Sequence, residues 1–124
     1  MAVAFRRFSF PKSARILRSV DFRRVYERGF RFSGRYFAAF CVQEKDPAGS
    51  GDGPKVGFTV PRALGRAVIR NRIRRRLREV VRRKMGALDQ GWEIVFNPRR
   101  SVLTAGVADL EREVQRLIER CKDS

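Results

Sequence analysis

The hydrophobic positions of the chain follow two different periods, which predict helices and strands in turn. Apolar residues spaced three and four apart predict three helices, over 20–28, about 66–85 and roughly 102–121. Short apolar segments bounded by turn residues predict three strands, over 35–43, 56–60 and 92–96. Elements in this order form a small α+β sandwich, so we expect a single domain over 1–124.

Residues that favour turns separate these elements. Ser19 is the expected N-cap of the first helix and Gly29 its end, and Asn97–Arg100 are expected to form a turn after the last strand. The stretch 44–55 is rich in Gly, Pro and Asp, which predicts a solvent-exposed loop between two strands. The segment 1–18 is basic and interrupted by a proline, so we expect it to be irregular.

The long helix predicted over 66–85 separates apolar from charged positions. Its apolar stripe, which is expected to face the core, consists of Ile69, Ile73, Leu77, Val80 and Val81. Its charged side has two lines of residues, the first with Asn71, Arg75, Arg78 and Arg82 and the second with Arg72, Arg76 and Arg83. Like charges at these spacings repel each other, so a polyanion is expected to relieve the repulsion. The last helix has a stripe that is expected to lie on the sheet, namely Val107, Leu110, Val114, Leu117, Ile118 and Cys121.

The charge balance indicates a polyanionic partner. The 124 residues include 29 Lys and Arg against 13 Asp and Glu, for a net charge of +16, while 43% are hydrophobic, which is enough for a core. Arginine supplies 24 of the 29 basic residues, and its planar guanidinium binds phosphate through two hydrogen bonds and stacks on bases. Between Arg62 and Lys84 there are ten Arg and one Lys against one Glu. We therefore expect a nucleic acid as the partner, rather than a merely solvated charged face.

The composition argues against catalysis by the chain's own side chains. There is no histidine, which excludes Ser–His and Cys–His nucleophile pairs and most zinc sites. The acidic residues are scattered, whereas a metal-dependent nuclease clusters several carboxylates around its ions. We therefore expect no catalytic residue and no metal site in the chain itself. Cys41 and Cys121 are far apart in the sequence and are expected to be reduced core thiols, which indicates a cytoplasmic protein.

Aromatic residues on the first helix and the first predicted strand are candidates for binding unpaired bases: Phe22, Tyr26, Phe37 and Phe40. If some of them line an open cleft they would stack on bases, and otherwise they belong to the core; the spacing leaves both interpretations open. The sequence has no helix-turn-helix punctuation, no zinc finger and no leucine zipper after the basic segment. RNA, or another single strand, is therefore favoured over duplex DNA.

The segment Val56–Glu79 closely resembles the signature of the bacterial ribonuclease P protein subunit, which is a strand, a basic turn, Gly-x-Ala-Val and then Arg-Asn-Arg with further basic residues. Asp21–Gly29 resembles the first helix of that family, and the strand that ends in Asn97–Arg100 also fits. The resemblance implies the order αβββαβα with a left-handed βαβ crossover. It also implies an RNA-binding cofactor role in a ribonucleoprotein that removes the 5′ leader of precursor tRNA. In that family a catalytic RNA subunit and Mg²⁺, bound mainly by the RNA, perform the hydrolysis.

The resemblance also assigns residues to two surfaces. Those that match a cleft for the single-stranded leader are Phe22, Tyr26, Phe40, Arg62, Arg66, Arg99 and Arg100. Those that match the basic helix, which meets the catalytic RNA in the family, are Arg70, Asn71, Arg72, Arg74, Arg75 and Arg78. Pro61, Ala63 and Arg66 depart from residues that are common in the family, and these departures concern the contacts of the basic turn.

Two alternatives belong to other classes of protein. A general RNA-binding module, such as a ribosomal protein or an RNA chaperone, would bind RNA without a role in processing. An autonomous nuclease would cleave RNA by itself, which the composition argues against. A membrane role is disfavoured because no apolar run approaches the roughly 20 residues of a membrane span. For the complex, the resemblance favours a monomer of this chain with ribonuclease P RNA and precursor tRNA as partners.

Overall fold

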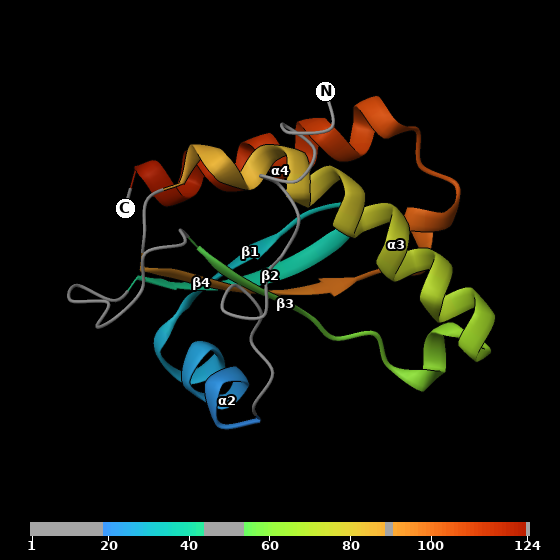
Figure 1. The fold of residues 1–124 in the computed structure, drawn as a ribbon, viewed down its shortest axis with the longest axis horizontal. Coiled ribbons are helices and arrows are strands. Elements are labelled where there is room, and N and C mark those ends of the chain that lie inside the picture. Colours follow the sequence, from blue (N-terminus) through green and yellow to red (C-terminus); the bar gives the residue numbers. More distant parts are fainter. Residues whose placement is uncertain (1–18, 44–53, 89–90, 124) are drawn as a thin grey trace, which may run out of the picture.

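The computed structural model describes residues 19–43, 54–88 and 91–123, which form one sheet with helices on both faces (Figure 1). Within these ranges the strands are β1 (Phe30–Ser33), β2 (Phe37–Gln43), β3 (Lys55–Phe58) and β4 (Trp92–Pro98). The helices are α2 (Ser19–Arg28), α3 (Ala67–Lys84) and α4 (Val107–Lys122), with short 3-10 helices η2 (Arg62–Leu64), η3 (Met85–Ala87) and η4 (Arg100–Leu103). The predicted α+β class and the order αβββαβα are confirmed.

The sheet combines antiparallel and parallel pairing in the strand order β1-β2-β4-β3. Strand β2 pairs antiparallel with β1 and with β4, whereas β3 pairs parallel with β4. Helix α3 links the two parallel strands, as a βαβ crossover requires, and the left hand of that crossover stays a prediction. Helices α3 and α4 cover one face of the sheet and α2 packs on the other (Figure 1). Because β3 and β4 run parallel, their carboxyl ends lie at the same edge of the sheet.

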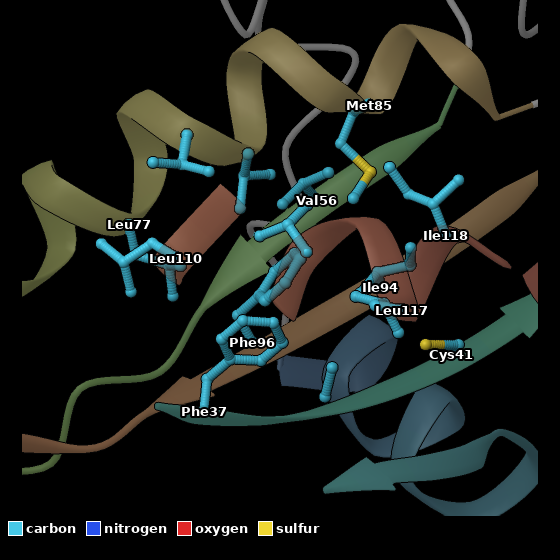
Figure 2. Close-up of a cluster of buried hydrophobic side chains, with 14 of the residues drawn as sticks. Phe37, Cys41, Val56, Leu77, Met85, Ile94, Phe96, Leu110, Leu117 and Ile118 are labelled. Atoms are coloured by element: carbon cyan, nitrogen blue, oxygen red, sulfur yellow. The ribbon is translucent and has the colours of Figure 1, made fainter. Parts of the chain in front are cut away.

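The main core lies between the sheet and the layer formed by α3 and α4 (Figure 2). Phe37 of β2 and Phe96 of β4 are fully buried there, with their ring centroids 5.2 Å apart. The predicted stripe of α3 is buried except for Ile69, which is half-buried. The predicted stripe of α4 is buried except for Val107, which is 46% exposed because it is the first residue of the helix. None of the helices in the described ranges has the length and apolar character needed to cross a membrane.

Glu113 is a fully buried carboxylate of α4 that holds the turn between β1 and β2. Its oxygens accept hydrogen bonds from the backbone N–H groups of Arg35 (2.7 Å), Tyr36 (2.8 Å) and Phe37 (3.0 Å). A Cβ atom added to Gly34 would lie 2.4 Å from the carboxyl carbon of Glu113, so a larger residue would displace this contact. The three hydrogen bonds fix the start of β2 against α4.

Two further pairs connect elements of the fold. Arg24 of α2 forms a salt bridge with Glu93 of β4, whose side chain is buried, and this pair fixes α2 on its face of the sheet. Cys41 of β2 and Cys121 of α4 are both buried free thiols, which agrees with the predicted core thiols. The two thiols are hydrogen-bonded to each other, and this bond together with burial raises the pKa of Cys41.

Strand β1 is the element that the hydrophobic pattern does not predict. Phe30 and Phe32 pack against the main core while Arg31 is exposed between them, so core-facing and exposed side chains do alternate along the strand. The alternation extends over only four residues, too few to stand out against its surroundings. The strand predicted over 35–43 begins later, at Phe37, because Glu113 holds the preceding backbone in a turn.

Two other predicted boundaries are wrong. Asn97 and Pro98, for which the sequence predicts a turn, are the last residues of β4, where Pro98 pairs with Phe37. The last helix starts at Val107, later than predicted, because Gly106 precedes it and the apolar residues Val102 and Leu103 belong to η4. The apolar side chains of a 3-10 helix repeat every three residues, which resembles the period of an α-helix over so short a segment.

Two predictions concern residues outside the described ranges. One is the irregular segment predicted over 1–18, and the other is the predicted loop over 44–55 as far as residue 53. The last residue of that loop, Lys55, is the first residue of β3.

Candidate nucleic-acid interface

Three of the predicted aromatic residues come together on the face of the sheet that α2 covers. Phe22 and Phe40 are half-buried and pack against Val25 and Val95 beneath them. The ring of Tyr26 meets the ring of Phe40 edge to face, with the centroids 4.6 Å apart, and Tyr26 is 37% exposed. We call Phe22, Tyr26 and Phe40 the aromatic cluster.

Phe37, the fourth candidate, belongs to the core. It is fully buried on the opposite face of β2, where its ring packs against Phe32 and Phe96. The difference from Phe40 follows from the alternation of side chains along a strand, because positions three apart face opposite sides. Base stacking by Phe37 is therefore excluded, while the other rings lie nearer the surface.

The hydroxyl of Tyr26 places the aromatic cluster at the carboxyl ends of β3 and β4. It donates a hydrogen bond to Oδ1 of Asn97 (3.0 Å) and lies 3.5 Å from Oγ1 of Thr59. Thr59 directly follows β3, and Asn97 lies in the last part of β4. The turns that leave these two strands carry the predicted basic residues, so aromatic and basic residues meet at one edge of the sheet.

The turn after β3 is held by hydrogen bonds from arginines. Nη1 of Arg100 donates to the carbonyl of Leu64 (2.8 Å), and Nε of Arg70 donates to the carbonyl of Gly65 (3.2 Å). Gly65 has a φ of 136°, which L side chains rarely adopt. Arg62 and Arg66, on either side of this turn, are exposed, so their guanidinium groups are accessible to a ligand.

The two arginines after β4 donate hydrogen bonds to different segments of the chain. Arg100 contacts the turn after β3, whereas Arg99 donates to the carbonyl of Gly34 through Nε (3.2 Å) and to Oγ of Ser33 through Nη2 (3.2 Å). Both are exposed, so these hydrogen bonds position guanidinium groups that still face solvent. We call the surface formed by Arg62, Arg66, Arg99 and Arg100 the basic end.

The six residues predicted on the basic helix all lie on α3, at different depths. Asn71, Arg72 and Arg75 are exposed, and Asn71 accepts a hydrogen bond through Oδ1 from Nη1 of Arg74 (2.8 Å). Arg70, Arg74 and Arg78 are half-buried, and the guanidinium of Arg78 lies 5.9 Å from the centroid of the Phe58 ring. The N-terminal half of α3 thus exposes Arg72 and Arg75 to solvent next to the basic end, with Arg70 and Arg74 partly exposed beside them.

Two arginines in the predicted charged lines of α3 have structural contacts instead. Arg76 donates through Nε to the carbonyl of Val102 (2.9 Å) and through Nη2 to the carbonyl of Ala105. Arg82 is buried and pairs with Glu79. The carbonyls of η4 and of the residues after it therefore occupy Arg76, which is not available to the nucleic acid that the charge pattern predicts.

The structure adds residues that the sequence pattern does not single out. Thr59 and Asn97 hold the hydroxyl of Tyr26. Arg31 is exposed on β1, and its guanidinium carbon lies 5.9 Å from the centroid of the Phe40 ring. The alternation of Phe30, Arg31 and Phe32 is the available signal, and it places Arg31 on the face opposite the core.

This arrangement suits the binding of a polyanion with unpaired bases. Guanidinium groups pair with phosphates and exposed rings stack on bases. In residues 19–43, 54–88 and 91–123 there is no group of three or more His, Cys, Asp or Glu side chains that could hold a metal ion. The buried carboxylates Glu93 and Glu113 are already engaged by Arg24 and by backbone N–H groups.

Comparisons with known proteins agree with this geometry. The family model described as Ribonuclease P matches residues 10–122. The chain is 37% identical over 110 residues to the ribonuclease P protein component of Acidothermus cellulolyticus, covering 89% of each chain. It is 30% identical over 112 residues to that of Clostridioides difficile, covering 90% of this chain and 94% of the relative.

Solved structures show the same fold. The ribonuclease P protein of Staphylococcus aureus superposes with a TM-score of 0.72 at 24% identity, covering 90% of this chain and 97% of that one. The protein from Thermotoga maritima gives a TM-score of 0.70 at 24% identity, covering 86% of this chain and 96% of that one. The similarity in fold therefore extends over most of the chain.

Proposed function

The chain belongs to the ribonuclease P protein family, and from this premise we propose that its two surfaces bind two different RNAs. Its role is that of the protein cofactor of ribonuclease P in tRNA 5′ processing, with the ribonuclease P RNA as its partner. The exposed side of α3 binds the RNA subunit, and the aromatic cluster with the basic end binds the 5′ leader of precursor tRNA. One copy of the chain acts in each complex, in the cytoplasm.

The exposed arginines of α3 act by neutralising phosphates. Arg72 and Arg75 are exposed on the same helix as the half-buried Arg70 and Arg74, which gives a dense array of positive charge. RNA folds that bring phosphates close together need cations to reduce the repulsion. A fixed array of guanidinium groups supplies this positive charge without the entropic cost of condensing free ions. The protein thereby lowers the Mg²⁺ concentration at which the RNA subunit is active.

The aromatic cluster distinguishes precursor tRNA from mature tRNA. The observation that carries this proposal is Tyr26, whose ring is exposed beside Phe40 and whose hydroxyl is anchored where the two basic turns begin. A single strand that reaches this point can pair its backbone with the basic end and stack a base on Tyr26. Mature tRNA has no leader to place there. Contacts to the backbone and to ring faces are independent of sequence, so the preference for particular leaders is weak.

Hydrolysis itself is assigned to the RNA subunit. The described residues do not fit a metal ion, because they contain no group of three or more potential ligands. We infer that Mg²⁺ binds RNA phosphates, where it would supply the charge stabilisation that phosphodiester hydrolysis requires. The side chains of this chain bind and position RNA, and none of them is given a catalytic role.

Replacement of Tyr26 tests the leader site. In the complex with ribonuclease P RNA, Tyr26→Ala should weaken binding of leader-bearing precursor tRNA by about tenfold, since stacking on one base contributes about 1–3 kcal/mol. Binding of mature tRNA should be unchanged. Both affinities are measured by equilibrium titration at a single salt concentration.

Tyr26→Phe is the matched control, because it keeps the ring and removes only the hydroxyl that contacts Asn97. It should retain most of the affinity for the precursor. If Tyr26→Ala weakened precursor and mature tRNA equally, leader stacking would be wrong and a general RNA-binding module would be favoured.

A further inference from the structure

Arg31 lies beside the aromatic cluster on β1, which is one of the two edge strands of the described sheet. It is exposed, and its guanidinium carbon is 5.9 Å from the centroid of the Phe40 ring. Among the residues that the structure describes, no carboxylate forms a salt bridge with Arg31. A guanidinium placed against a ring keeps N–H groups at its edge for a phosphate.

The register of the sheet places Arg31 in line with the aromatic cluster. Arg31 pairs with Phe40, and Phe40 pairs with Val95, so these residues form one row across β1, β2 and β4. Asn97, which holds the hydroxyl of Tyr26, lies two residues further along β4 and points to the same face. Neighbouring strands are about 4.8 Å apart, so the row extends about 10 Å from β4 to β1.

A second arginine reaches β1 from the basic end. Nη2 of Arg99 donates a hydrogen bond to Oγ of Ser33 (3.2 Å), and Ser33 is exposed on the same face of β1 as Arg31. Two residues along a strand span about 7 Å. Two guanidinium groups therefore border the β1 side of the aromatic cluster, while Arg62 and Arg66 follow β3 on its other side.

We propose that Arg31 binds a backbone phosphate of the 5′ leader at a distal subsite on β1. The leader then runs across the strands, from the turn after β3, over Tyr26 and Phe40, to Arg31. The contact with the Phe40 ring holds the guanidinium in place before RNA binds, which reduces the entropic cost of ordering this side chain. This inference rests on the proposed function, because it extends the leader site defined by Tyr26.

Binding measurements with leaders of increasing length test the subsite. Precursor tRNAs whose leaders lengthen one nucleotide at a time are titrated with the complex of ribonuclease P RNA and either wild type, Arg31→Gln or Arg31→Lys. Arg31→Gln should bind mature tRNA and the shortest leaders as wild type does. Its affinity should fall about two- to fivefold below that of wild type once the leader reaches β1, as expected for an exposed ion pair. Arg31→Lys should keep most of the affinity, because it keeps the charge.

Arg112→Gln is the matched control, since Arg112 is an exposed arginine of α4 on the opposite face of the sheet. It should show no dependence on leader length. The proposal is overturned if Arg31→Gln binds the long leaders as wild type does, or if its affinity for mature tRNA falls by the same factor. It is also overturned if Arg31→Lys is as weak as Arg31→Gln. Tyr26→Ala distinguishes a failure of the leader site from a failure of the Arg31 subsite. If the loss of affinity depends on the leader for Tyr26→Ala but not for Arg31→Gln, the leader site is supported and only the Arg31 subsite is wrong.

Discussion

Single residues decide how the surfaces of this protein are held, and Glu113 is the clearest case. Its carboxylate is fully buried and accepts three backbone hydrogen bonds from the turn that starts β2. No pattern in the sequence indicates this contact, because the acceptor and its donors are more than 70 residues apart. A glutamate on the face of a helix is ordinarily expected in solvent.

Glu113→Gln should destabilise the fold by about 1–3 kcal/mol, because one amide oxygen cannot replace two carboxylate oxygens and the NH₂ group faces N–H donors. The free energy of unfolding is measured by urea denaturation. Glu111→Gln is the control, since Glu111 is half-buried and its Oε2 lies 4.0 Å from Nζ of Lys84. This variant should lower the free energy of unfolding by less than about 0.5 kcal/mol. Equal destabilisation in the two variants would mean that the buried hydrogen bonds do not hold the turn.

The aromatic residues show what a hydrophobic pattern can and cannot resolve. Phe22, Tyr26 and Phe40 are predicted as a group, and they do lie together. Phe37 cannot be separated from them by pattern, because 35–43 is apolar on both faces and the sequence does not specify the register of β2. Only the packing of α2 on one face and of α3 and α4 on the other distinguishes the two environments (Figure 1).

Among the elements, α3 is predictable from the sequence and β1 is not. An amphipathic helix of 18 residues repeats its pattern over several turns, so its bounds and most of its buried stripe follow from spacing. Strand β1 has only four residues and gains its stability from pairing with β2. The charge pattern places Arg76 among the residues that face a nucleic acid, but Arg76 contacts η4, which the apolar period assigns to the last helix.

The proposed role of α3 predicts a specific change in salt dependence. Replacing the exposed residues Arg72 and Arg75 together by Gln should weaken binding to ribonuclease P RNA severalfold at low salt. The slope of log K against log salt should become shallower by about 0.7–0.9 for each phosphate that the variant no longer neutralises. Affinities are measured by equilibrium binding over a series of salt concentrations.

The same titration with Arg112→Gln serves as the comparison, because this variant removes one exposed positive charge from α4 instead of α3. Its slope should match that of the wild type. An unchanged slope for the double variant would show that Arg72 and Arg75 neutralise no phosphates of the RNA. An equal change for Arg112→Gln would show that binding depends on net charge and not on the exposed side of α3.

In the whole molecule, the candidate site results from topology. The parallel pairing of β3 with β4 brings the turns that follow them to one edge, and Tyr26 of α2 reaches both strand ends. Residues from α2, β2, the turn after β3 and η4 meet there, although they are spread over most of the sequence. Hydrophobic periods specify elements but not their order in a sheet, so this meeting place follows from the family resemblance and not from the pattern.

The whole molecule is the protein cofactor of ribonuclease P. Cleavage at low Mg²⁺ tests our proposal that it assists a catalytic RNA subunit. Precursor tRNA is incubated with ribonuclease P RNA and the protein, with the RNA without the protein, and with the protein alone. We expect strong stimulation at the correct 5′ site when RNA and protein are both present, and no cleavage by the protein alone. Binding to the RNA without stimulation, or cleavage by the protein alone, would contradict the cofactor role.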